Sequence, residues 1–398
     1  MNERARQEAR TDRRFTIGML APCPFPTHQG TQVLIRHLAA ALSRAGHRVH
    51  LVTYGYGEYD EALPFRVHRA RRFDAGLRSG PNWTKPAADA AMLVAAHRVV
   101  KSEKVDLWHV HNIEGLALGA LLKLHARLPL VYHAHNAMGP ELPVYFRRHI
   151  TRVLASKLGD VLDQTLPRAA DAVVVFDPDQ KTFLEVSGVS PQRVHVIPPG
   201  LDGSEVAPAD PAEMAKLRER YGGGPWLIYA GNPDPYQNLP LMWRAFALVR
   251  EKRPDVRLLM VSHHPAAAFA GELNSSGAPG GVVFHQYRDI AELRALLALA
   301  EVGLSPRTLW VGAPIKVLNY LAAGVPVVAC RSGARHVVTP ECGVLVDGTA
   351  EAFASGIFRL LLEPLDRDGC RTGFERFSIE AQVPRYEETY AALLRDAG

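Results

Sequence analysis

Short apolar runs alternate with amphipathic stretches throughout both halves of the chain. In the first half the runs cover residues 15–20, 49–53, 105–110, 130–134, 172–176 and 194–197. In the second half they cover residues 226–230, 256–261, 282–285, 300–304 and 325–330. Continuous apolar runs between helical stretches are typical of parallel strands that are buried on both faces. The pattern therefore predicts an α/β protein with two Rossmann-like sheets, one in each half.

A stretch rich in proline, glycine and aspartate interrupts this alternation between residues 198 and 225. We therefore expect an N-terminal domain at residues 1–199, a linker at 200–225, a second domain at 226–373 and a terminal helix at 374–398. Ligands of open parallel sheets bind beyond the carboxyl ends of the strands. Residues that directly follow the predicted strands are therefore the first candidates for a functional site.

The segment at residues 312–324 predicts a short helix in front of the strand at 325–330. Pro314 suits the first turn of that helix, and Gly324 suits the position just after its end. Helical spacing predicts a polar face of Lys316, Asn319, Tyr320 and Ala323. It directs Ile315, Leu318 and Ala322 toward a core. Because a lysine near a helix N-terminus opposes the helix dipole, we expect an anionic ligand in front of this helix.

With the Val-Pro-Val-Val strand behind it, this helix resembles the donor-binding helix of family 4 glycosyltransferases, which are enzymes of GT-B type. The resemblance covers nearly the whole chain. It implies two Rossmann-like domains that face each other across a cleft, with a C-terminal helix that crosses back to the first domain. It also implies retaining transfer of a sugar from a nucleotide-diphosphate sugar to an acceptor hydroxyl, in polysaccharide or glycolipid biosynthesis.

The resemblance also sets the expected partners. They are a nucleotide-sugar donor and a sugar, lipid-linked or small-molecule acceptor, without nucleic acid. The departing diphosphate would accept the proton of the acceptor hydroxyl, and no metal or other cofactor would be required.

Two pairs of histidines stand at the ends of neighbouring predicted strands, His109 with His111 and His133 with His135. Side chains alternate along a strand, so both members of each pair point to the same side and four imidazoles gather at one sheet edge. Such a cluster is either a metal site or the polar floor of an active site. No carboxylate completes a recognised zinc pattern, which favours the polar floor.

The resemblance assigns a role to each part of this strand end. His135 matches the family histidine that contacts the transferred sugar, and it is the expected catalytic residue of the first domain. We expect four neighbours to bind substrate, namely His111, His133, Asn136 and Glu141.

A glycine loop follows the first predicted strand. Gln29 and Gly30 precede a predicted helix, where exposed backbone N–H groups can meet a hydroxyl or a phosphate. The loop resembles the family's glycine loop, which lies beside the acceptor and the donor diphosphate. We therefore expect both residues to bind substrate.

In the second domain the resemblance points to six substrate-binding residues: Gly231, Asn232, Tyr287, Gly312, Pro314 and Asn319. The common family pattern also has an arginine or similar residue near Asn232 and a lysine at Gln237, which neutralise the leaving diphosphate. Both cations are missing here. Arg307 and Lys316 are the available replacements, and we expect these two cations to act in catalysis.

The donor helix departs from the common pattern a second time. Two glutamates of that pattern are replaced by Val311 and Asn319. The departures are consistent with one linked variant of the family, or with a catalytically weak or inactive GT-B protein that acts as a nucleotide-sugar-binding or scaffolding subunit. A nonhydrolysing sugar-nucleotide epimerase is a third interpretation, which the Pro-Val-Val strand and the terminal helix favour less. Hydrolysis or transfer of a donor separates the enzyme from the binding subunit.

The positive charge of the chain lies in its first half. Residues 1–200 contain 26 Lys and Arg against 18 Asp and Glu, a balance of +8, which leaves 20 against 23, or −3, for residues 201–398. This basic half is compatible with an anionic membrane surface or a phosphate-bearing acceptor. Within it, residues 142–157 combine apolar side chains with four cations. The segment is either a peripheral membrane helix or one whose core face consists of Val144, Phe146, Ile150 and Leu154.

The first ten residues are too polar for a signal peptide, and no apolar run reaches the roughly 18 residues of a membrane span. We expect a cytoplasmic protein, either freely soluble or on the inner face of the membrane. The four cysteines lie far apart in the sequence and predict reduced thiols.

Overall fold

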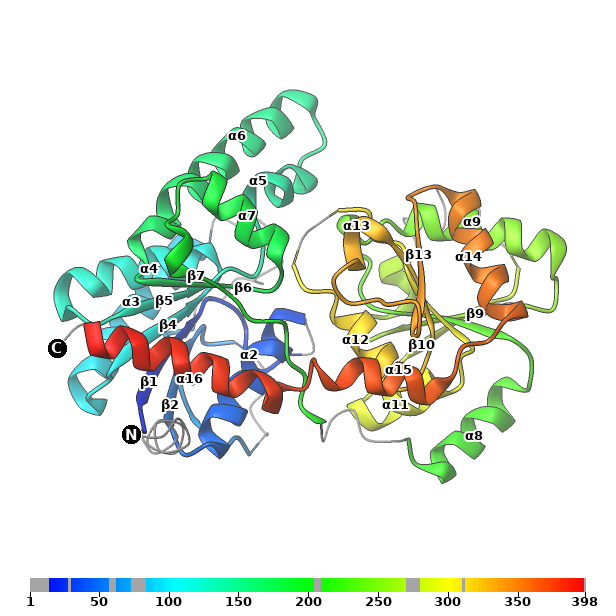
Figure 1. The fold of residues 1–398 in the computed structure, drawn as a ribbon, viewed down its shortest axis with the longest axis horizontal. Helices are drawn as coiled ribbons and strands as arrows, with labels where there is room; N and C mark the ends of the chain where they lie inside the picture. The colour runs from blue at the N-terminus through cyan, green and yellow to red at the C-terminus, as the bar shows by residue number, and fades with distance from the viewer. Residues whose placement is uncertain are drawn as a thin grey trace, which may run out of the picture. The chain divides into compact units, whose positions relative to one another are not determined.

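The computed structural model describes residues 14–27, 30–56, 62–72, 84–203, 209–269, 280–309 and 312–396. The chain forms two compact units (Figure 1). Unit 1 consists of Met1–Gly200 and Gln382–Gly398, and unit 2 consists of Leu201–Ala381. Each unit is built on an open parallel sheet, which confirms the predicted fold class. The residues that were expected to form a linker lie in unit 2, except for Gly200.

The sheet of unit 1 has seven strands in the order β3-β2-β1-β4-β5-β6-β7, and each neighbouring pair is parallel. The strands are β1 (Thr16–Ala21), β2 (Arg48–Thr53), β3 (Arg66–Arg69), β4 (Leu107–His111), β5 (Leu130–His133), β6 (Ala172–Val175) and β7 (Val194–Val196). Every apolar run predicted in this half overlaps a strand. The pattern missed β3, because this edge strand reads Arg-Val-His-Arg and has a single large apolar residue.

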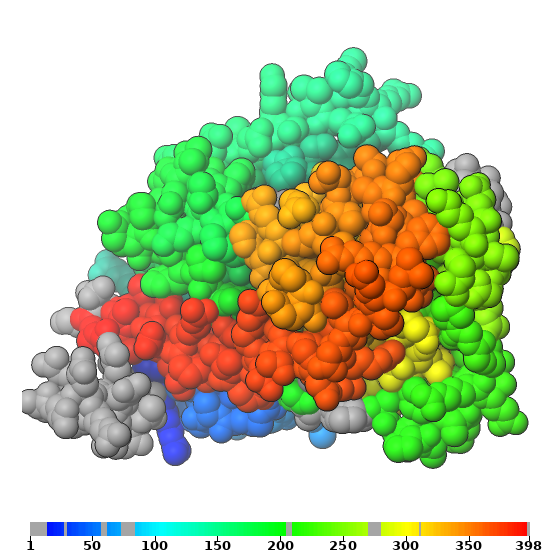
Figure 2. All heavy atoms as spheres, turned by 45° about the vertical axis from the view of Figure 1, so that its right-hand side comes forward, coloured from blue at the N-terminus to red at the C-terminus, as the bar shows by residue number. Residues whose placement is uncertain are grey.

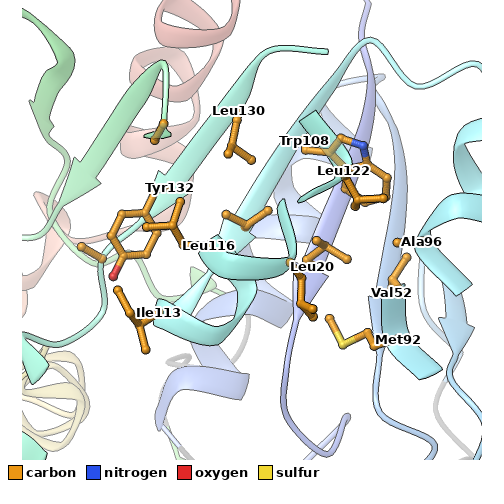
Figure 3. Packing of buried hydrophobic residues seen from close by; sticks show 14 of the residues in the cluster. Leu20, Val52, Met92, Ala96, Trp108, Ile113, Leu116, Leu122, Leu130 and Tyr132 are labelled. Carbon is orange, nitrogen blue, oxygen red and sulfur yellow. The ribbon is translucent and has the colours of Figure 1, made fainter. Parts of the chain in front are cut away.

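The main helices of unit 1 are α2 (Gly30–Arg44), α3 (Lys85–Glu103), α4 (Asn112–Ala126), α5 (Met138–Glu141), α6 (His149–Thr165) and α7 (Pro178–Val186). One face of the sheet packs against α3 and α4 (Figure 3). There Leu20 and Trp108 of the strands pack with Met92 of α3 and Leu116 of α4. Because side chains alternate along a strand, the histidines of β4 point to the opposite face.

The last helix, α16 (Ile379–Asp396), packs against that opposite face of unit 1 with the residues from Gln382 onward. Tyr386 and Tyr390 are buried there. The ring of Tyr390 meets Phe15 edge-on at 6.3 Å between centroids. Glu387 and His47 Nε2 lie 3.0 Å apart. The middle of α16 is therefore part of the core of unit 1.

Helix α6 packs through small residues and leaves its branched apolar residues exposed. Ala155 and Gly159 are buried, and a side chain at position 159 would come within 2.4 Å of the carbonyl oxygen of Met138. Ile150 is 73% exposed and Leu154 is 61% exposed, so the interpretation of these two residues as core residues is wrong. The α6 segment lies at the surface, at the top of Figure 2. None of the helices in the described ranges is both long enough and apolar enough to cross a bilayer.

The sheet of unit 2 has six parallel strands in the order β10-β9-β8-β11-β12-β13. They are β8 (Trp226–Ala230), β9 (Arg257–Ser262), β10 (Val282–Gln286), β11 (Val302–Ser305), β12 (Val327–Cys330) and β13 (Gly343–Val346). The apolar pattern missed the edge strand β13, whose run of Val-Leu-Val is short. The main helices are α8 (Pro211–Tyr221), α9 (Leu239–Lys252), α11 (Ile290–Ala298), α12 (Ile315–Ala322), α13 (Arg331–Ala334), α14 (Ala350–Leu362) and α15 (Arg367–Glu375).

The helix expected at residues 312–324 is α12, and Gly324 follows it with a positive φ of 71°. One detail of its predicted faces is wrong, because Tyr320 lies in the core. Its Oη accepts a hydrogen bond from the backbone N–H of Ala230 at 2.8 Å and lies 3.3 Å from the carbonyl oxygen of Leu304. The missing side chain of Gly303 leaves the room that this ring occupies.

We expect Gly303→Ala to destabilise unit 2. A Cβ atom at position 303 would lie 2.6 Å from Tyr320 Cδ2, so the ring has to shift. Overpacking of this kind typically costs about 1–3 kcal/mol. Gly223→Ala is the control in the same unit, because nothing lies within 4 Å of a Cβ atom there. Calorimetric melting should show a loss of stability for Gly303→Ala alone, and equal melting curves for the two variants would contradict this packing.

Candidate functional site

Four histidines cluster at the carboxyl ends of β4 and β5, as the alternation predicted. A hydrogen bond of 3.2 Å joins His109 Nε2 and His133 Nδ1, and one of 2.9 Å joins His111 Nδ1 and His135 Nε2. The rings of neighbouring pairs stack with centroids 4.5–4.7 Å apart. All four side chains are buried. The prediction that four imidazoles gather at one sheet edge is therefore confirmed.

Burial keeps these imidazoles neutral. It lowers the pKa of His109 and of His135 to about 3, and it lowers the pKa of His111 and His133 well below the ordinary value. A neutral imidazole has one donor and one acceptor nitrogen. Among the described residues, the buried Nε2 atoms of His111 and His133 have no hydrogen-bond partner. These two nitrogens can therefore form a hydrogen bond with a ligand group or a water molecule.

Tyr390 of α16 extends this cluster. Its Oη lies 2.6 Å from His109 Nδ1, and both groups are buried. The sequence interpretation did not include Tyr390 in the site. The signal was present in the sequence, because Tyr386 and Tyr390 are four residues apart and share one face of the terminal helix. Only the packing of α16 shows that this face meets the histidines.

Asn136 and Glu141 lie together after β5. The side chain of Asn136 hydrogen-bonds to Glu141, and Tyr145 Oη donates to Glu141 Oε1 at 3.0 Å. Burial raises the pKa of the Glu141 carboxyl group. The start of α5 is fixed by Asp163 of α6, which accepts the N–H groups of Met138 and Gly139 at 3.0 and 2.9 Å. These contacts hold the segment after His135 in place.

Gly30 is the first residue of α2 and is exposed. The N–H groups in the first turn of a helix have no partner within the helix, so this end of α2 can accept a polar ligand. The structure thus places a helix N-terminus at the predicted glycine. Gln29, the other residue expected in this loop, lies outside the described residues.

In unit 2, Lys316 is the centre of the polar contacts. Its Nζ donates to Tyr229 Oη at 3.1 Å and to Gln237 Oε1, and it lies 4.1 Å from the centroid of the Tyr229 ring. Burial lowers the pKa of Lys316 well below its ordinary value, and the nearby Arg307 guanidinium lowers it further. The ammonium group therefore lies beside Gln237, the position where the common family pattern carries its lysine.

A short chain of hydrogen bonds fixes the loop after β8 around Lys316. Gln237 Nε2 donates to Asn232 Oδ1 at 3.2 Å, and Asn232 Nδ2 donates to Asp234 Oδ2 at 2.5 Å. Gly231 lies between these groups, and a Cβ atom there would come within 3.2 Å of Lys316 Nζ. A glycine at this position therefore favours the close approach of this loop and the lysine. The structure brings Gly231, Asn232 and Lys316 together as expected.

Arg307 follows β11 and is buried. Its Nη2 donates to the carbonyl oxygens of Gly312 at 2.9 Å and Gly333 at 3.1 Å. The side chain thus connects the loop in front of α12 to α13. Its guanidinium supports the backbone near Lys316, and its role toward a diphosphate stays a prediction.

The remaining predicted residues of unit 2 fall into two places. Gly312 has a positive φ of 62°, Pro314 is the residue before α12, and Asn319 is half-buried on that helix. Tyr287 follows β10, and β9 separates β10 from β8 in the sheet. Since neighbouring strands lie about 4.8 Å apart, Tyr287 belongs to a separate part of the sheet edge. Burial raises the pKa of Tyr287 to about 12.

Tyr229 is the partner of Lys316 that sequence reasoning missed. It is fully buried, its Oη accepts from Lys316 and donates to the carbonyl oxygen of Asn232 at 2.8 Å. An apolar strand with an aromatic residue before Ala-Gly is common, so the sequence carried no specific signal. The contact depends on α12 packing against β8 and β11.

Three of the histidines, His109, His111 and His133, offer ligand atoms within 4.8 Å of one another and form a candidate metal site. A divalent ion would bring its charge into a fully buried site. The charged groups that shift the pKa values of these three histidines are other histidines, with no carboxylate among them. Burying an uncompensated charge is costly, so the donor set fits a neutral polar floor better than a metal centre.

The chain matches two family models, Glycosyltransferase Family 4 over residues 28–205 and Glycosyl transferases group 1 over residues 224–363. A GDP-mannose-dependent alpha-(1-6)-phosphatidylinositol monomannoside mannosyltransferase of Mycolicibacterium smegmatis is 33% identical over 75% of this chain and 82% of its own length. An MMP alpha-(1->4)-mannosyltransferase of Mycolicibacterium hassiacum is 27% identical over 92% of this chain and 97% of its own length.

Solved structures share the fold. A sucrose-phosphate synthase of Thermosynechococcus elongatus superposes with a TM-score of 0.80 at 20% identity, over 96% of this chain and 100% of that chain. WaaG, a glycosyltransferase involved in lipopolysaccharide biosynthesis, superposes with a TM-score of 0.70 at 17% identity, over 94% of this chain and 98% of that chain. Both likenesses support the same two-sheet architecture.

The buried histidines predict a stability that falls in acid. Their folded pKa values lie below the ordinary 6.5, so the unfolded chain binds more protons below that pH. Each histidine then removes about 1.4 kcal/mol of stability per pH unit below 6.5. Melting at pH 7.5, 6.5 and 5.5 should show this loss, with a shallower slope for His109→Gln. His97→Gln, at an exposed position of α3, should keep the wild-type slope. A melting temperature independent of pH over this range would contradict the assignment.

Proposed function

The chain belongs to glycosyltransferase family 4, and we propose that it transfers a hexose from a nucleotide-diphosphate sugar to an acceptor hydroxyl with retention of configuration. The observation that carries this proposal is the partly buried amino group of Lys316, which lies beside Gln237 and Tyr229 in unit 2. A cation that is partly removed from water is stabilised by a nearby anion. A diphosphate bound in front of α12 provides that anion.

The leaving group is then stabilised by groups that are already in position. Lys316 Nζ and the positive end of the α12 dipole stabilise the negative charge that develops on the diphosphate. The diphosphate in turn favours the protonated form of Lys316, whose pKa is low in the unliganded protein. The backbone near Lys316 is fixed by Arg307 through Gly312. The departing oxygen accepts the proton of the acceptor hydroxyl.

The sugar is assigned to the histidine cluster. His135, His111 and His133 are neutral and buried, so they offer donors and acceptors for hydroxyl groups without a fixed charge. His135 ends this row of imidazoles and contacts the transferred sugar in the proposal. The mannosyltransferase relatives make GDP-mannose the first donor to test.

A two-step experiment tests this function. A thermal-shift screen with GDP, UDP and ADP should identify one nucleotide that raises the melting temperature in a concentration-dependent manner. The matching sugar nucleotide should then be consumed with lipid-linked or small-molecule acceptors. His135→Ala should slow the transfer and leave nucleotide affinity close to that of the wild type. Nucleotide binding with neither hydrolysis nor transfer would favour the alternative of a binding or scaffolding subunit.

We expect Lys316→Ala to weaken nucleoside-diphosphate binding. Loss of a charge-assisted contact to a buried phosphate should cost about 1.5–3 kcal/mol, which is roughly a 10- to 150-fold loss of affinity. Lys216→Ala is the matched control, because this lysine of α8 is exposed and pairs with Glu213. Isothermal titration calorimetry measures both affinities. An unchanged affinity of Lys316→Ala would remove Lys316 from the diphosphate site.

We further propose a lipid-linked acceptor at an anionic membrane surface. The exposed face of α6 carries Ile150, Val153, Leu154, Leu158 and Val161. Exposed cations flank it at Arg147, Arg148, Arg152 and Lys157. Apolar residues of this kind insert at the lipid interface, and each cation adds about 1 kcal/mol near anionic lipid. The phosphatidylinositol monomannoside in the name of the 33%-identical relative supports an acceptor of this class.

Sedimentation with vesicles tests the membrane contact. At low salt the protein should bind anionic vesicles in preference to neutral ones, and salt should reduce this binding. The double change of Ile150 and Leu154 to glutamine should weaken it. Val186→Gln is the control, because Val186 is also exposed but lies on α7. Equal binding to neutral and anionic vesicles at low salt would contradict the membrane contact and favour a soluble acceptor molecule.

A further inference from the structure

A second group of metal-ligating side chains lies away from the site described above. His50 of β2, His68 of β3 and Glu103 at the end of α3 offer one ligand atom each within 4.8 Å of one another. His50 Nδ1 lies 3.0 Å from His68 Nε2, and His50 Nε2 lies 3.7 Å from Glu103 Oε2. His50 stands near the amino end of its strand. In register it is level with Gly18 of β1 and Trp108 of β4, so the group lies on the α3 face of the sheet, opposite to the face of His109 and His111.

The donor set suits a transition-metal ion of the zinc type. Two imidazoles and one carboxylate are a ligand set that zinc uses with water at the fourth position. Burial lowers the pKa of His50 and of His68, so both imidazoles are neutral at neutral pH and protons compete little for the ligand nitrogens. The carboxylate of Glu103 offsets part of the charge of the ion.

The present spacing is close to what coordination requires. Zn–N bonds of about 2.0–2.1 Å in a tetrahedral site place ligand nitrogens about 3.3 Å apart. His50 Nδ1 lies 3.0 Å from His68 Nε2, so a small outward movement brings this pair to that spacing. The contact of His50 with Glu103 is made by its other nitrogen, Nε2, but the three residues offer one ligand atom each within 4.8 Å of one another. His68 and Glu103 are partly exposed, which leaves a path from solvent. Among the described residues, the metal-ligating group on β4 and β5 contains histidines alone, and these are buried.

One group competes for the carboxylate. Arg66 Nη1 lies 3.5 Å from Glu103 Oε2, and this arginine side chain is 72% exposed. Exposed ion pairs of this kind are weak, so the arginine can swing into solvent when an ion binds. Arg48, the other cation near His50, is held by Thr16 Oγ1 at 2.8 Å.

We propose that His50, His68 and Glu103 bind a divalent transition-metal ion, with zinc as the preferred metal. The ion connects β2, the edge strand β3 and the end of α3. Because β3 is an edge strand that pairs with β2 alone, such a cross-link stabilises this edge of the sheet. The inference is independent of the proposed transfer reaction.

The test uses the full chain without a polyhistidine tag, stripped of metal with a chelator. Titration with Zn²⁺ should show one tight site and a rise in melting temperature. Titration with Co²⁺ should give the ligand-field absorption of a tetrahedral site with nitrogen and oxygen ligands. Absence of binding, or binding without these signatures, would overturn the proposal.

Four variants locate the ion. His68→Asn and Glu103→Gln should each weaken Zn²⁺ binding at least about tenfold, because each removes one ligand. Arg66→Gln should strengthen binding, because it frees Glu103. His97→Asn is the matched control on α3 and should bind like the wild type. Melting of the metal-free variants checks that they fold. Unchanged affinity in both His68→Asn and Glu103→Gln would place the ion elsewhere and contradict the proposal.

Discussion

The partly buried amino group of Lys316 is the constraint on which the candidate site of unit 2 depends. Among the described residues no carboxylate forms an ion pair with Lys316, and its contacts are Tyr229 Oη, Gln237 Oε1 and the face of the Tyr229 ring. Burying such a charge is costly unless it is hydrogen-bonded or paired. The neighbouring residues are arranged so that the amino group of Lys316 keeps its hydrogen bonds. Gly231 lets the loop after β8 approach the ammonium, and Gln237 is itself held by Asn232. The arrangement suits an anion, and the proposed function assigns the donor diphosphate to it.

The candidate site of unit 1 consists of neutral groups. Its four imidazoles are buried, and they hydrogen-bond in two pairs. Tyr390 adds a hydroxyl group from the last helix of the chain, so the integrity of this cluster depends on α16. Neutral donors and acceptors suit sugar hydroxyls, whereas a cation suits a diphosphate.

Two surface features of unit 1, the exposed face of α6 and the histidine pair at β3, result from how their elements pack. Helix α6 packs through Ala155 and Gly159, because small residues allow its backbone to approach α5. Its larger apolar residues are consequently exposed, and this exposure supports a membrane role. At β3 the short polar edge strand brings His68 beside His50. Both features lie outside the contacts that define the histidine cluster.

The sequence by itself determined the two parallel sheets, because continuous apolar runs separated by helices have few other solutions. It also determined that the histidines of β4 and β5 gather, since strand alternation and parallel pairing require it, and that an unusual lysine lies on the helix at 312–324. Only the tertiary structure decided which side chains these residues contact. Tyr320 entered the core because Gly303 leaves room for its ring, and Lys316 reached Gln237 because α12 packs beside the loop after β8. Ile150 and Leu154 became exposed because α6 packs on its small residues. Periodicity assigns a residue to a face of its own element, whereas the contacts of that face depend on segments distant in the sequence.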